Sequence, residues 1–422
     1  TGINPEKRVS ASIASQCPTF SFVLHYTVVP TNLPAQESYG CLQNLYKKCL
    51  NQAMDDAKEI LAAGGSANEA VEKAVHVLED FELFNAGRGS VFNNKEFHEM
   101  EACFADGTGK FGSTCLIRHV EHPITLAKLL AERMNHAYIA GFGAEEYALR
   151  FGLQLVPEDY FDTDFRRIQV RKAKQTSTAA TMTLDHGGSS STAAAGGGSS
   201  SEPLSDVQQA IRMLSKKLGE SGGPGPLQTI NFPPSSSHTP ATSPEKSFEG
   251  GGGSGQRTSA VPLSEGDRVS VAQLPPGLED LENRKFGTVG AVAIDKYGHV
   301  AAATSTGGLN NKPVGRIGDS SILGHSTWAN DETVAISCTG MGEIFMANCV
   351  AHDLHARVKY SEANLAEAAD VVLGEVLPPM CGGFVGIDAK NRLLVLKFNT
   401  SGMFRGFATE SHRQVKIWTE ED

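Results

Sequence analysis

The middle of the chain, from about residue 176 to residue 284, is too poor in apolar side chains to build a core. Runs of glycine, serine and proline recur through it, at 187–191, 196–201, 233–237 and 250–255. Such compositions bury too little apolar surface to offset the entropy of ordering, so the stretch is predicted to be a largely disordered linker. About 310 of the 422 residues remain, a length that suits one large α/β unit. We therefore expect two ordered parts, 1–175 and 285–422, that fold together.

One threonine directly follows this linker and begins an apolar run. Thr288 lies in the sequence Gly287-Thr288-Val289-Gly290-Ala291-Val292. If the peptide bond after Gly287 is cut, Thr288 carries a hydroxyl nucleophile and also a base, its new α-amine, with a pKa of about 8. Pairing a threonine with its own amino terminus is one way to activate this nucleophile. The alternative is an ordinary threonine in a β-hairpin, because the runs 289–294 and 299–304 flank a turn.

Further along, a cation and an anion lie three residues apart between glycines. They are Arg316 and Asp319, in the sequence Gly-Arg-Ile-Gly-Asp-Ser at 315–320. A planar guanidinium matches the two oxygens of a carboxylate, and an aspartate accepts hydrogen bonds from an ammonium group. The pair is therefore suited to hold a zwitterion. The alternative is a surface ion pair, which contributes little to stability.

A third motif, Ser-Cys-Thr-Gly-Met-Gly-Glu at 337–343, closes an apolar run and opens a predicted helix. Backbone N–H groups at a strand-to-helix turn, with a hydroxyl nearby, suit a developing oxyanion. An ordinary glycine turn is the alternative interpretation.

Together these motifs resemble the threonine-dependent N-terminal nucleophile hydrolases of the plant-type asparaginase and isoaspartyl peptidase family. The resemblance covers roughly 40–175 and 286–410. In the first part it rests on the segments 78–90, 99–102, 106–107 and 139–145. In the second part it rests on the segment that begins at Thr288 and on 304–308, 315–319 and 338–343. The order and spacing of these motifs argue against chance similarity.

The resemblance implies a catalytic centre around Thr288, freed as the nucleophile by self-cleavage after Gly287. Thr306 would lie beside Thr288, within hydrogen-bonding reach of its amine and hydroxyl. Asn85 would line the pocket near the nucleophile.

The resemblance also implies where the substrate binds. Thr339 and the N–H group of Gly340 would form the oxyanion hole. Arg316 and Asp319 would hold the α-carboxylate and the α-ammonium of the substrate, assisted by Gly342.

The family binds sodium through backbone carbonyls of a loop that here runs from Leu78 to Arg88. Neutral, hard oxygen atoms suit an alkali ion. No other cofactor is expected. The implied carbonyl ligands are those of Leu78, Glu79, Phe81, Phe84, Ala86 and Arg88.

The implied activity is hydrolysis of the side-chain amide of L-asparagine and of the isopeptide bond of β-aspartyl dipeptides, through an acyl-enzyme on Thr288. The expected partners are these small-molecule substrates and a second protomer, as a dimer of self-cleaved α/β protomers. The nearest alternative is a threonine aspartase that cuts partner proteins. Asp319 argues against it, because an internal aspartyl residue has no free α-ammonium to offer.

One departure from the family pattern leaves a non-catalytic scaffold as another alternative, and a second departure is milder. Leu24 and His25 are followed by Tyr-Thr-Val-Val-Pro at 26–30, where the family usually has a glycine-rich loop that positions the precursor for self-cleavage. Glu101 stands where the family usually has aspartate.

Composition excludes some functions. The formal net charge of −11 argues against a nucleic-acid partner. The eight cysteines show no paired-ligand spacing, which is typical of reduced thiols in a cytoplasmic protein. No run reaches the ~18 consecutive apolar residues of a membrane span. The apolar run 20–29 is interpreted as a first core strand.

Periodicity predicts helix pairs in the first part and hairpins in the second. The predicted helices are 42–61, one that starts at a Ser66–Glu69 capping box, 123–133, 143–151, 342–358 and 361–374. The predicted strands are 114–119, 289–294, 299–304, 333–337, 383–387 and 392–398. Two sheets between helical layers satisfy this pattern, and the family fold is such a four-layer αββα sandwich. An amphipathic helix is also predicted at 205–219, and the basic run 166–174 is interpreted as a solvated helix end.

Overall fold

The computed structural model describes residues 12–13, 20–28, 40–177, 287–361 and 363–417. They belong to one compact unit, which is formed by Thr1–Met182 and Glu265–Asp422. The predicted helix at 205–219 and nearly all of the predicted linker lie outside the described residues. The part boundaries at 175 and 285 therefore stay predictions.

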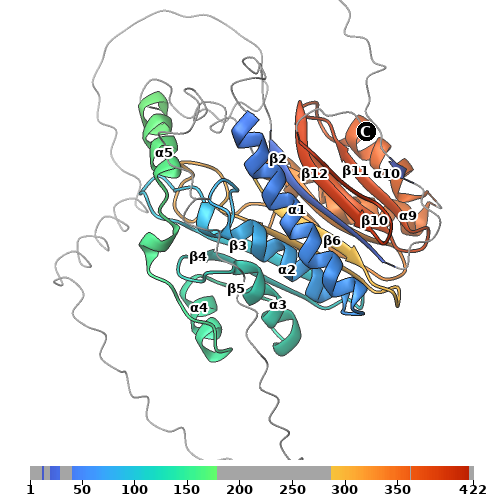
Figure 1. Ribbon diagram of the computed structural model, residues 1–422. Helices are drawn as coiled ribbons and strands as arrows, with labels where there is room; N and C mark the ends of the chain where they lie inside the picture. The colour runs from blue at the N-terminus through green and yellow to red at the C-terminus, as the bar shows by residue number, and fades with distance from the viewer. Residues whose placement is uncertain (1–11, 14–19, 29–39, 178–286, 362, 418–422) are drawn as a thin grey trace, which may run out of the picture. The chain divides into compact units, whose positions relative to one another are not determined.

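Three helices before the linker lie at or near their predicted positions (Figure 1). They are α1 (Gly40–Ala62), α2 (Ala67–Asp80) and α3 (Pro123–Arg133). The predicted capping box starts α2: the Glu69 N–H donates to the Ser66 hydroxyl, and the Ser66 N–H donates to the Glu69 carboxylate at 2.8 Å. Pro123 starts α3, because proline fits a first helical turn whose N–H groups have no partner within the helix.

An eight-stranded sheet carries the order β13-β12-β2-β6-β7-β3-β4-β5. Strands from before and after the linker alternate in it: β2 lies between β12 and β6, and β7 pairs with β3. The two parts of the chain thus share one sheet. Its strands are β2 (Ser21–Val28), β3 (Met100–Asp106), β4 (Phe111–Ile117), β5 (Tyr138–Ala140), β6 (Val289–Ile294), β7 (Val300–Thr306), β12 (Gly402–Thr409) and β13 (Arg413–Lys416).

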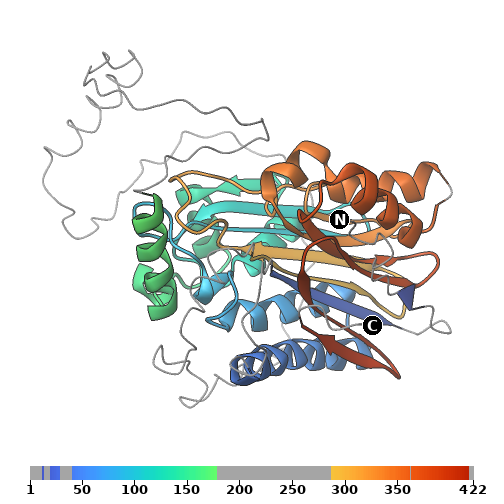
Figure 2. The same cartoon turned by 90° about the horizontal axis from the view of Figure 1, so that it is seen from above.

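A second sheet of five strands has the order β1-β11-β10-β9-β8. Its strands are β1 (Ser12–Ile13), β8 (Thr327–Ala329), β9 (Val334–Gly340), β10 (Gly382–Asp388) and β11 (Leu393–Phe398). The two sheets face each other, and each has helices on its other face (Figure 2). The helices α1, α2 and α3 pack on the larger sheet, while α9 (Val350–Tyr360) and α10 (Leu365–Val371) pack on the smaller one.

Strand β6 shows how the sequence builds these layers. Val289, Ala291 and Ala293 belong to the core beneath the helices, whereas Val292 and Ile294 belong to the core between the sheets. Alternate residues of a strand point to opposite faces, and both faces are buried here. A continuous apolar run is the expected sequence of such a strand.

The prediction of a single helix at 342–358 is wrong, because two helices lie there. The first, α8 (Gly342–Asn348), ends where Cys349 takes a left-handed conformation with φ 47°, and α9 starts at Val350. Residues with a Cβ atom rarely adopt this conformation, so nothing in the local sequence predicts the break. The helix predicted at 361–374 is confirmed as α10, which is shorter than predicted. A π-helical turn, Val372–Val376, follows α10.

The interpretation of the basic run 166–174 as a solvated helix end is also wrong for Arg166, its first residue. Helix α5 (Asp164–Ser177) does contain the run, but Arg166 is only 2% exposed. Its guanidinium donates to the carbonyls of Gly89 and Leu83, at 2.6 and 3.0 Å. Arg166 therefore ties α5 to the loop that follows α2.

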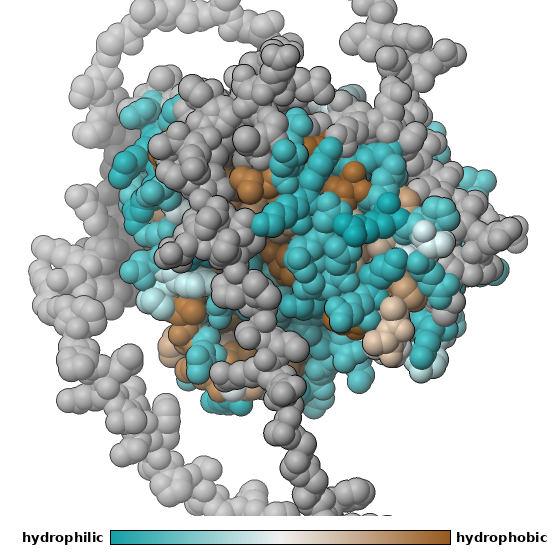
Figure 3. Space-filling view, in the orientation of Figure 1, coloured by the Kyte–Doolittle hydropathy of each residue, from teal (hydrophilic) through white to brown (hydrophobic). Residues whose placement is uncertain are grey.

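The surface in Figure 3 is largely hydrophilic, with hydrophobic residues gathered near α4 (Gly141–Arg150). On this helix Phe142 is 77% exposed and Leu149 is 56% exposed. Among the described residues, no helix combines the length and the apolar character needed to cross a membrane.

Candidate active site

One pocket gathers residues from four separate segments of the described chain. Its empty volume is about 250 Å³, which includes space open to solvent. Seven of the predicted site residues line it: Gly287, Thr288, Thr306, Arg316, Asp319, Gly340 and Gly342. Four further residues line it as well: Gly308, Leu309, Gly318 and Ser320.

Thr288 and Thr306 meet because β6 and β7 form a hairpin. Val289 pairs with Ser305 in this antiparallel ladder, so Thr288 lies one step further, opposite Thr306. The Thr306 hydroxyl donates to the carbonyl oxygen of Gly287 at 2.8 Å. That carbonyl belongs to the peptide bond directly before Thr288.

A second donor reaches the same carbonyl from the first part of the chain. The Asn85 side-chain amide donates to the oxygen of Gly287 at 2.9 Å and to the oxygen of Gly308 at 2.7 Å. Its own oxygen accepts from the Val91 N–H at 3.0 Å. These bonds fix the amide orientation, so the Gly287 carbonyl is held between two neutral donors.

Arg316 and Asp319 lie in the loop between β7 and β8, and the described structure shows no ion pair between them. The Arg316 guanidinium instead binds Glu343 of α8, with Nε–Oε1 and Nη2–Oε1 distances of 3.1 and 2.9 Å. The Asp319 carboxylate accepts from the Ser326 hydroxyl at 2.7 Å. The sequence analysis did not foresee Glu343 or Ser326 in these contacts.

Burial makes Asp319 sensitive to pH in the neutral range. It raises the pKa of the Asp319 carboxyl to about 6, and the Ser326 hydrogen bond and the Arg316 charge act in the opposite direction. Burial disfavours the charged form of a carboxyl group. Asp319 is thus an anion at neutral pH, and none of the described residues brings a cation into direct contact with it.

Gly342 lies against both the Asp319 carboxylate and the Arg316 guanidinium. A Cβ atom at this position would be 2.8 Å from Asp319 Oδ1 and 2.9 Å from Arg316 Nη2. Any side chain there would push into the space between the two charges. Glycine therefore keeps the pocket open at the point where a zwitterion would bind.

Thr339 and Gly340 end strand β9, next to the pocket. The Thr339 hydroxyl is buried and has no hydrogen-bond partner among the described residues. A buried hydroxyl without a partner is costly, so this group is available to a ligand. A Cβ atom at Gly340 would be 2.5 Å from the Cys381 carbonyl oxygen, which explains the glycine.

The loop predicted to bind sodium is tightly curled and rich in carbonyl oxygens. A Cβ atom at Gly87 would lie 2.6 Å from the Glu79 oxygen, and one at Gly89 would lie 1.9 Å from the Phe84 oxygen. Arg88 points elsewhere, to Glu82 at 3.0 Å. Among the described residues, no group of three or more His, Cys, Asp and Glu side chains is suited to bind a metal.

Strand β2 continues where the family usually has its glycine-rich loop. It runs past His25 to Val28, and Tyr26 pairs with Val289 beside the nucleophile. His25 is buried, which lowers its pKa to about 3. Its Nε2 lies 2.9 Å from the Ser337 hydroxyl of β9. A regular strand thus occupies 26–28, the described part of the position expected for the loop.

Comparison with known proteins agrees with this site. The sequence model of a family described as asparaginase matches residues 29–200 and 256–417. Isoaspartyl peptidases of Salmonella typhimurium and Escherichia coli are each 32% identical over 365 residues, or 86% of this chain and 87% and 85% of theirs. An isoaspartyl peptidase/L-asparaginase of Xenopus laevis is 27% identical over 384 residues, or 90% of this chain and 92% of its own. The chain therefore belongs to the asparaginase family that includes these isoaspartyl peptidases.

Proposed function

We propose that this chain is a self-processing amidohydrolase that acts on L-asparagine and on β-aspartyl dipeptides. It is a hydrolase of the N-terminal nucleophile type, in line with the names of its relatives. The observation that carries the proposal is the Gly287 carbonyl, which Thr306 and Asn85 hold directly before Thr288. These two donors polarise the peptide bond that self-cleavage must break.

In the proposed self-cleavage, the Thr288 hydroxyl attacks the Gly287 carbonyl carbon. Negative charge develops on the carbonyl oxygen, where Thr306 and Asn85 already donate, and donors arranged in advance stabilise such a charge. The C–N bond breaks, the acyl group passes to the Thr288 oxygen, and the hydroxyl proton passes to the nitrogen, which becomes a free amine. Water then hydrolyses the ester, which leaves a carboxylate on Gly287 and an α-amine on Thr288.

In the proposed turnover, the freed Thr288 attacks the side-chain carbonyl of the substrate. Its α-amine takes the hydroxyl proton and passes it to the leaving ammonia or amino acid. The acyl-enzyme is a β-aspartyl ester on Thr288, and water hydrolyses it to aspartate. Thr339, whose hydroxyl has no hydrogen-bond partner in the described part of the chain, and the Gly340 N–H would stabilise the oxyanion.

Substrate recognition would use the charged side of the pocket. Arg316 would bind the α-carboxylate through the N–H groups that Glu343 leaves free, and Asp319 would bind the α-ammonium next to Gly342. The buried Asp319 anion disfavours a threonine aspartase, because an internal aspartyl residue would leave it without a cation.

The same proposal extends to the architecture. Helices on the outer faces of two facing sheets support the four-layer αββα sandwich of N-terminal nucleophile hydrolases, with 176–284 as an insertion before the nucleophile. Carbonyls at Leu78, Glu79, Phe81, Phe84, Ala86 and Arg88 would hold a structural sodium ion. The exposed Phe142 and Leu149 offer an apolar surface for a dimer, and the protein would act in the cytoplasm.

The test measures processing and activity on the same sample. Intact mass and N-terminal sequencing should find pieces 1–287 and 288–422, and the cleaved protein should hydrolyse a free β-aspartyl dipeptide far faster than its N-acetylated form. Active protein without a chain that starts at Thr288 would refute the mechanism. Equal rates on both dipeptides would favour the threonine aspartase. A chain that never cleaves and never hydrolyses would be the scaffold.

A further inference from the structure

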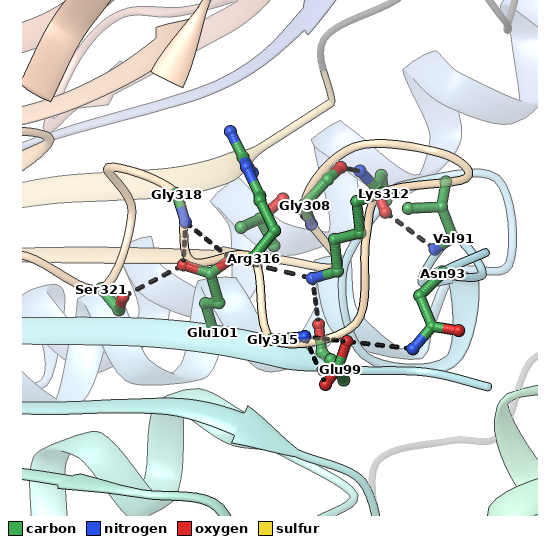
Figure 4. A network of polar contacts seen from close by, with 12 residues as sticks. Val91, Asn93, Glu99, Glu101, Gly308, Lys312, Gly315, Arg316, Gly318 and Ser321 are labelled. Atoms are coloured by element: carbon green, nitrogen blue, oxygen red, sulfur yellow. Dashed lines mark hydrogen bonds and ion pairs between the residues drawn. The ribbon is translucent and has the colours of Figure 1, made fainter. Parts of the chain in front are cut away.

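Two glutamates at the start of β3 hold the loop that carries Arg316. The Glu99 carboxylate accepts from the Gly315 N–H, at 3.1 and 3.2 Å to its two oxygens, and from the Asn93 amide at 2.9 Å. The Glu101 carboxylate accepts from the Gly318 N–H at 3.0 and 2.9 Å. The two glutamates therefore bind the loop on both sides of Arg316 (Figure 4).

A buried lysine completes this arrangement. Lys312 Nζ donates to the Glu99 backbone oxygen at 2.7 Å and lies 3.8 Å from Glu101 Oε1, with both side chains of this ion pair fully buried. The Ser321 hydroxyl also donates to Glu101, at 3.0 Å. A buried ion pair is weak evidence for stability, because desolvation offsets the attraction of the charges. Its position next to the pocket suggests another role.

Glu101 connects this loop to the nucleophile end of the pocket. It pairs with Thr306 across the β3–β7 ladder, so both side chains project from the same face of the sheet. The neighbouring β3–β4 ladder has an irregular register between Met100 and Ala102, and Leu116 of β4 has φ 57°. Bulges beside active sites often redirect a side chain.

We infer that Glu99 and Glu101 are positioning residues that set the distance between the substrate clamp, Arg316 and Asp319, and the nucleophile. This inference rests on the proposed function of the same pocket. Glu101 is decisive, because its bond to Gly318 fixes the residue directly before Asp319. Aspartate at position 101 is one methylene shorter, so it would keep the charge beside Lys312 but lose the reach to Gly318 and Ser321.

Self-cleavage gives this inference an internal control. The Gly287 carbonyl is held by Thr306 and Asn85, and self-cleavage needs no substrate carboxylate or ammonium. A variant that only displaces the clamp should therefore process normally and bind substrate poorly. A variant that damages the whole site should lose both properties together.

The experiment compares Glu101→Asp and Glu101→Gln with a matched control, Glu145→Gln. Glu145 is another buried glutamate that accepts from backbone N–H groups, those of Arg118 and His119 at 2.6 and 3.0 Å, and it does not line the pocket. Self-cleavage is followed by intact mass, hydrolysis by kcat and KM for a β-aspartyl dipeptide, and zwitterion binding by calorimetry with L-aspartate.

We expect Glu101→Asp to raise KM and to weaken L-aspartate binding by about tenfold or more, since small misplacements in a site have large effects. The rate of self-cleavage should stay within about twofold of the wild type, and Glu145→Gln should change none of these values. The inference is overturned if both Glu101 variants bind L-aspartate normally, or if self-cleavage falls in proportion to binding. Wild-type protein that binds L-aspartate but hydrolyses no dipeptide would refute the proposed function alone, and wild-type protein that binds none would refute both.

Discussion

The two ends of the pocket are built from different chemistry. Around the Gly287 carbonyl, every described contact comes from a neutral group, the Thr306 hydroxyl and the Asn85 amide. Around Arg316 and Asp319 the site is charged: Glu343 binds Arg316, the buried pair of Lys312 and Glu101 lies beneath the loop between them, and only Ser326 adds a neutral contact, to Asp319. Neutral donors suit any amide carbonyl, whereas fixed charges select one kind of substrate. The comparison predicts that the two ends can be damaged separately.

The largest effect is expected from Thr288→Ala, at the neutral end. It removes the hydroxyl nucleophile of both reactions, so the chain should stay full length on a denaturing gel. Activity should fall on the order of 10⁶-fold, as in other hydrolases that lose their nucleophile. Thr288→Ser should still cleave, but more slowly. Thr333→Ala, which removes a buried threonine outside the pocket, is the control and should process normally.

The next largest effect is expected at the charged end. Arg316→Ala and Asp319→Ala should each reduce kcat/KM for a β-aspartyl dipeptide roughly 100-fold, which corresponds to about 3 kcal/mol. Each variant leaves one charged group of the bound substrate, the α-carboxylate or the α-ammonium, desolvated and without its partner. Both variants should still cleave after Gly287 at the wild-type rate by intact mass. Loss of self-cleavage in either variant would mean that the two ends are not separable.

Thr306→Val tests the neutral end of the pocket without removing the nucleophile. Valine has nearly the shape of threonine but cannot donate to the Gly287 carbonyl, and the loss of one such donor costs roughly 100-fold in rate. Self-cleavage should slow by that amount in a time course of intact mass. Unchanged processing would assign the stabilisation to Asn85 alone.

The charged end should also respond to pH. The pKa of Asp319 is raised to about 6, so below that value the carboxyl becomes neutral and cannot pair with an ammonium group. KM should then rise about tenfold for each pH unit below the pKa. Self-cleavage after Gly287 should lack this particular dependence.

The free energy of unfolding should respond to the pH in the opposite direction: low pH weakens substrate binding by Asp319 but favours the folded protein. A carboxyl group whose folded pKa is raised above its unfolded value of about 3.9 binds its proton more tightly in the folded state. Its contribution to the free energy of unfolding is therefore full below pH ~4, and it falls by about 3 kcal/mol at most as the pH rises through about 6. Denaturant titrations of the unliganded protein at pH 4 and pH 7 measure this contribution. Asp319→Asn should remove it, and an unaltered difference between the two pH values would assign it to other groups.

The smallest effect is expected from deleting 184–277. The cost of closing a flexible loop changes by only about 0.6 kcal/mol for each doubling of its length. The shortened protein should process and hydrolyse like the wild type. Loss of either property, restored when 205–219 is kept, would show that this segment packs against the rest of the protein.

The sequence predicted best those elements whose bounds are set locally. The Ser66–Glu69 capping box and the bounds of α3 are confirmed, because each depends on residues within one helical turn. The strand at 289–294 is confirmed too, since both of its faces are buried and its residues are apolar throughout. The interpretation of 20–29 as a core strand is confirmed by β2.

The sequence failed where distant partners decide the structure. Strand β3 was missed, because Glu101 and Asp106 make it look polar, although Glu101 is fully buried. Strand β12 was missed for a similar reason: it contains Arg405, which is 1% exposed. The break at Cys349 and the burial of Arg166 have no local signal either.

For the site, motifs predicted which residues approach the pocket but not how they are held. Thr288, Thr306, Arg316 and Asp319 do line one pocket, while their roles remain predictions. Glu343, Lys312 and Ser326 stabilise that pocket through contacts across the fold. Such contacts depend on the tertiary arrangement, so no spacing in the chain reveals them.

The alternation of strands in the larger sheet has a consequence for the protein after cleavage. Because β2 lies between β12 and β6 and β3 pairs with β7, a cut after Gly287 turns one chain into two chains that share a sheet. Unfolding then becomes a dissociation, and the midpoint of denaturation becomes dependent on protein concentration. Refolding would require two molecules to meet, without the linker that once connected them. The processed protein would thus assemble once, as a precursor, and its later persistence would depend on how slowly its sheet opens.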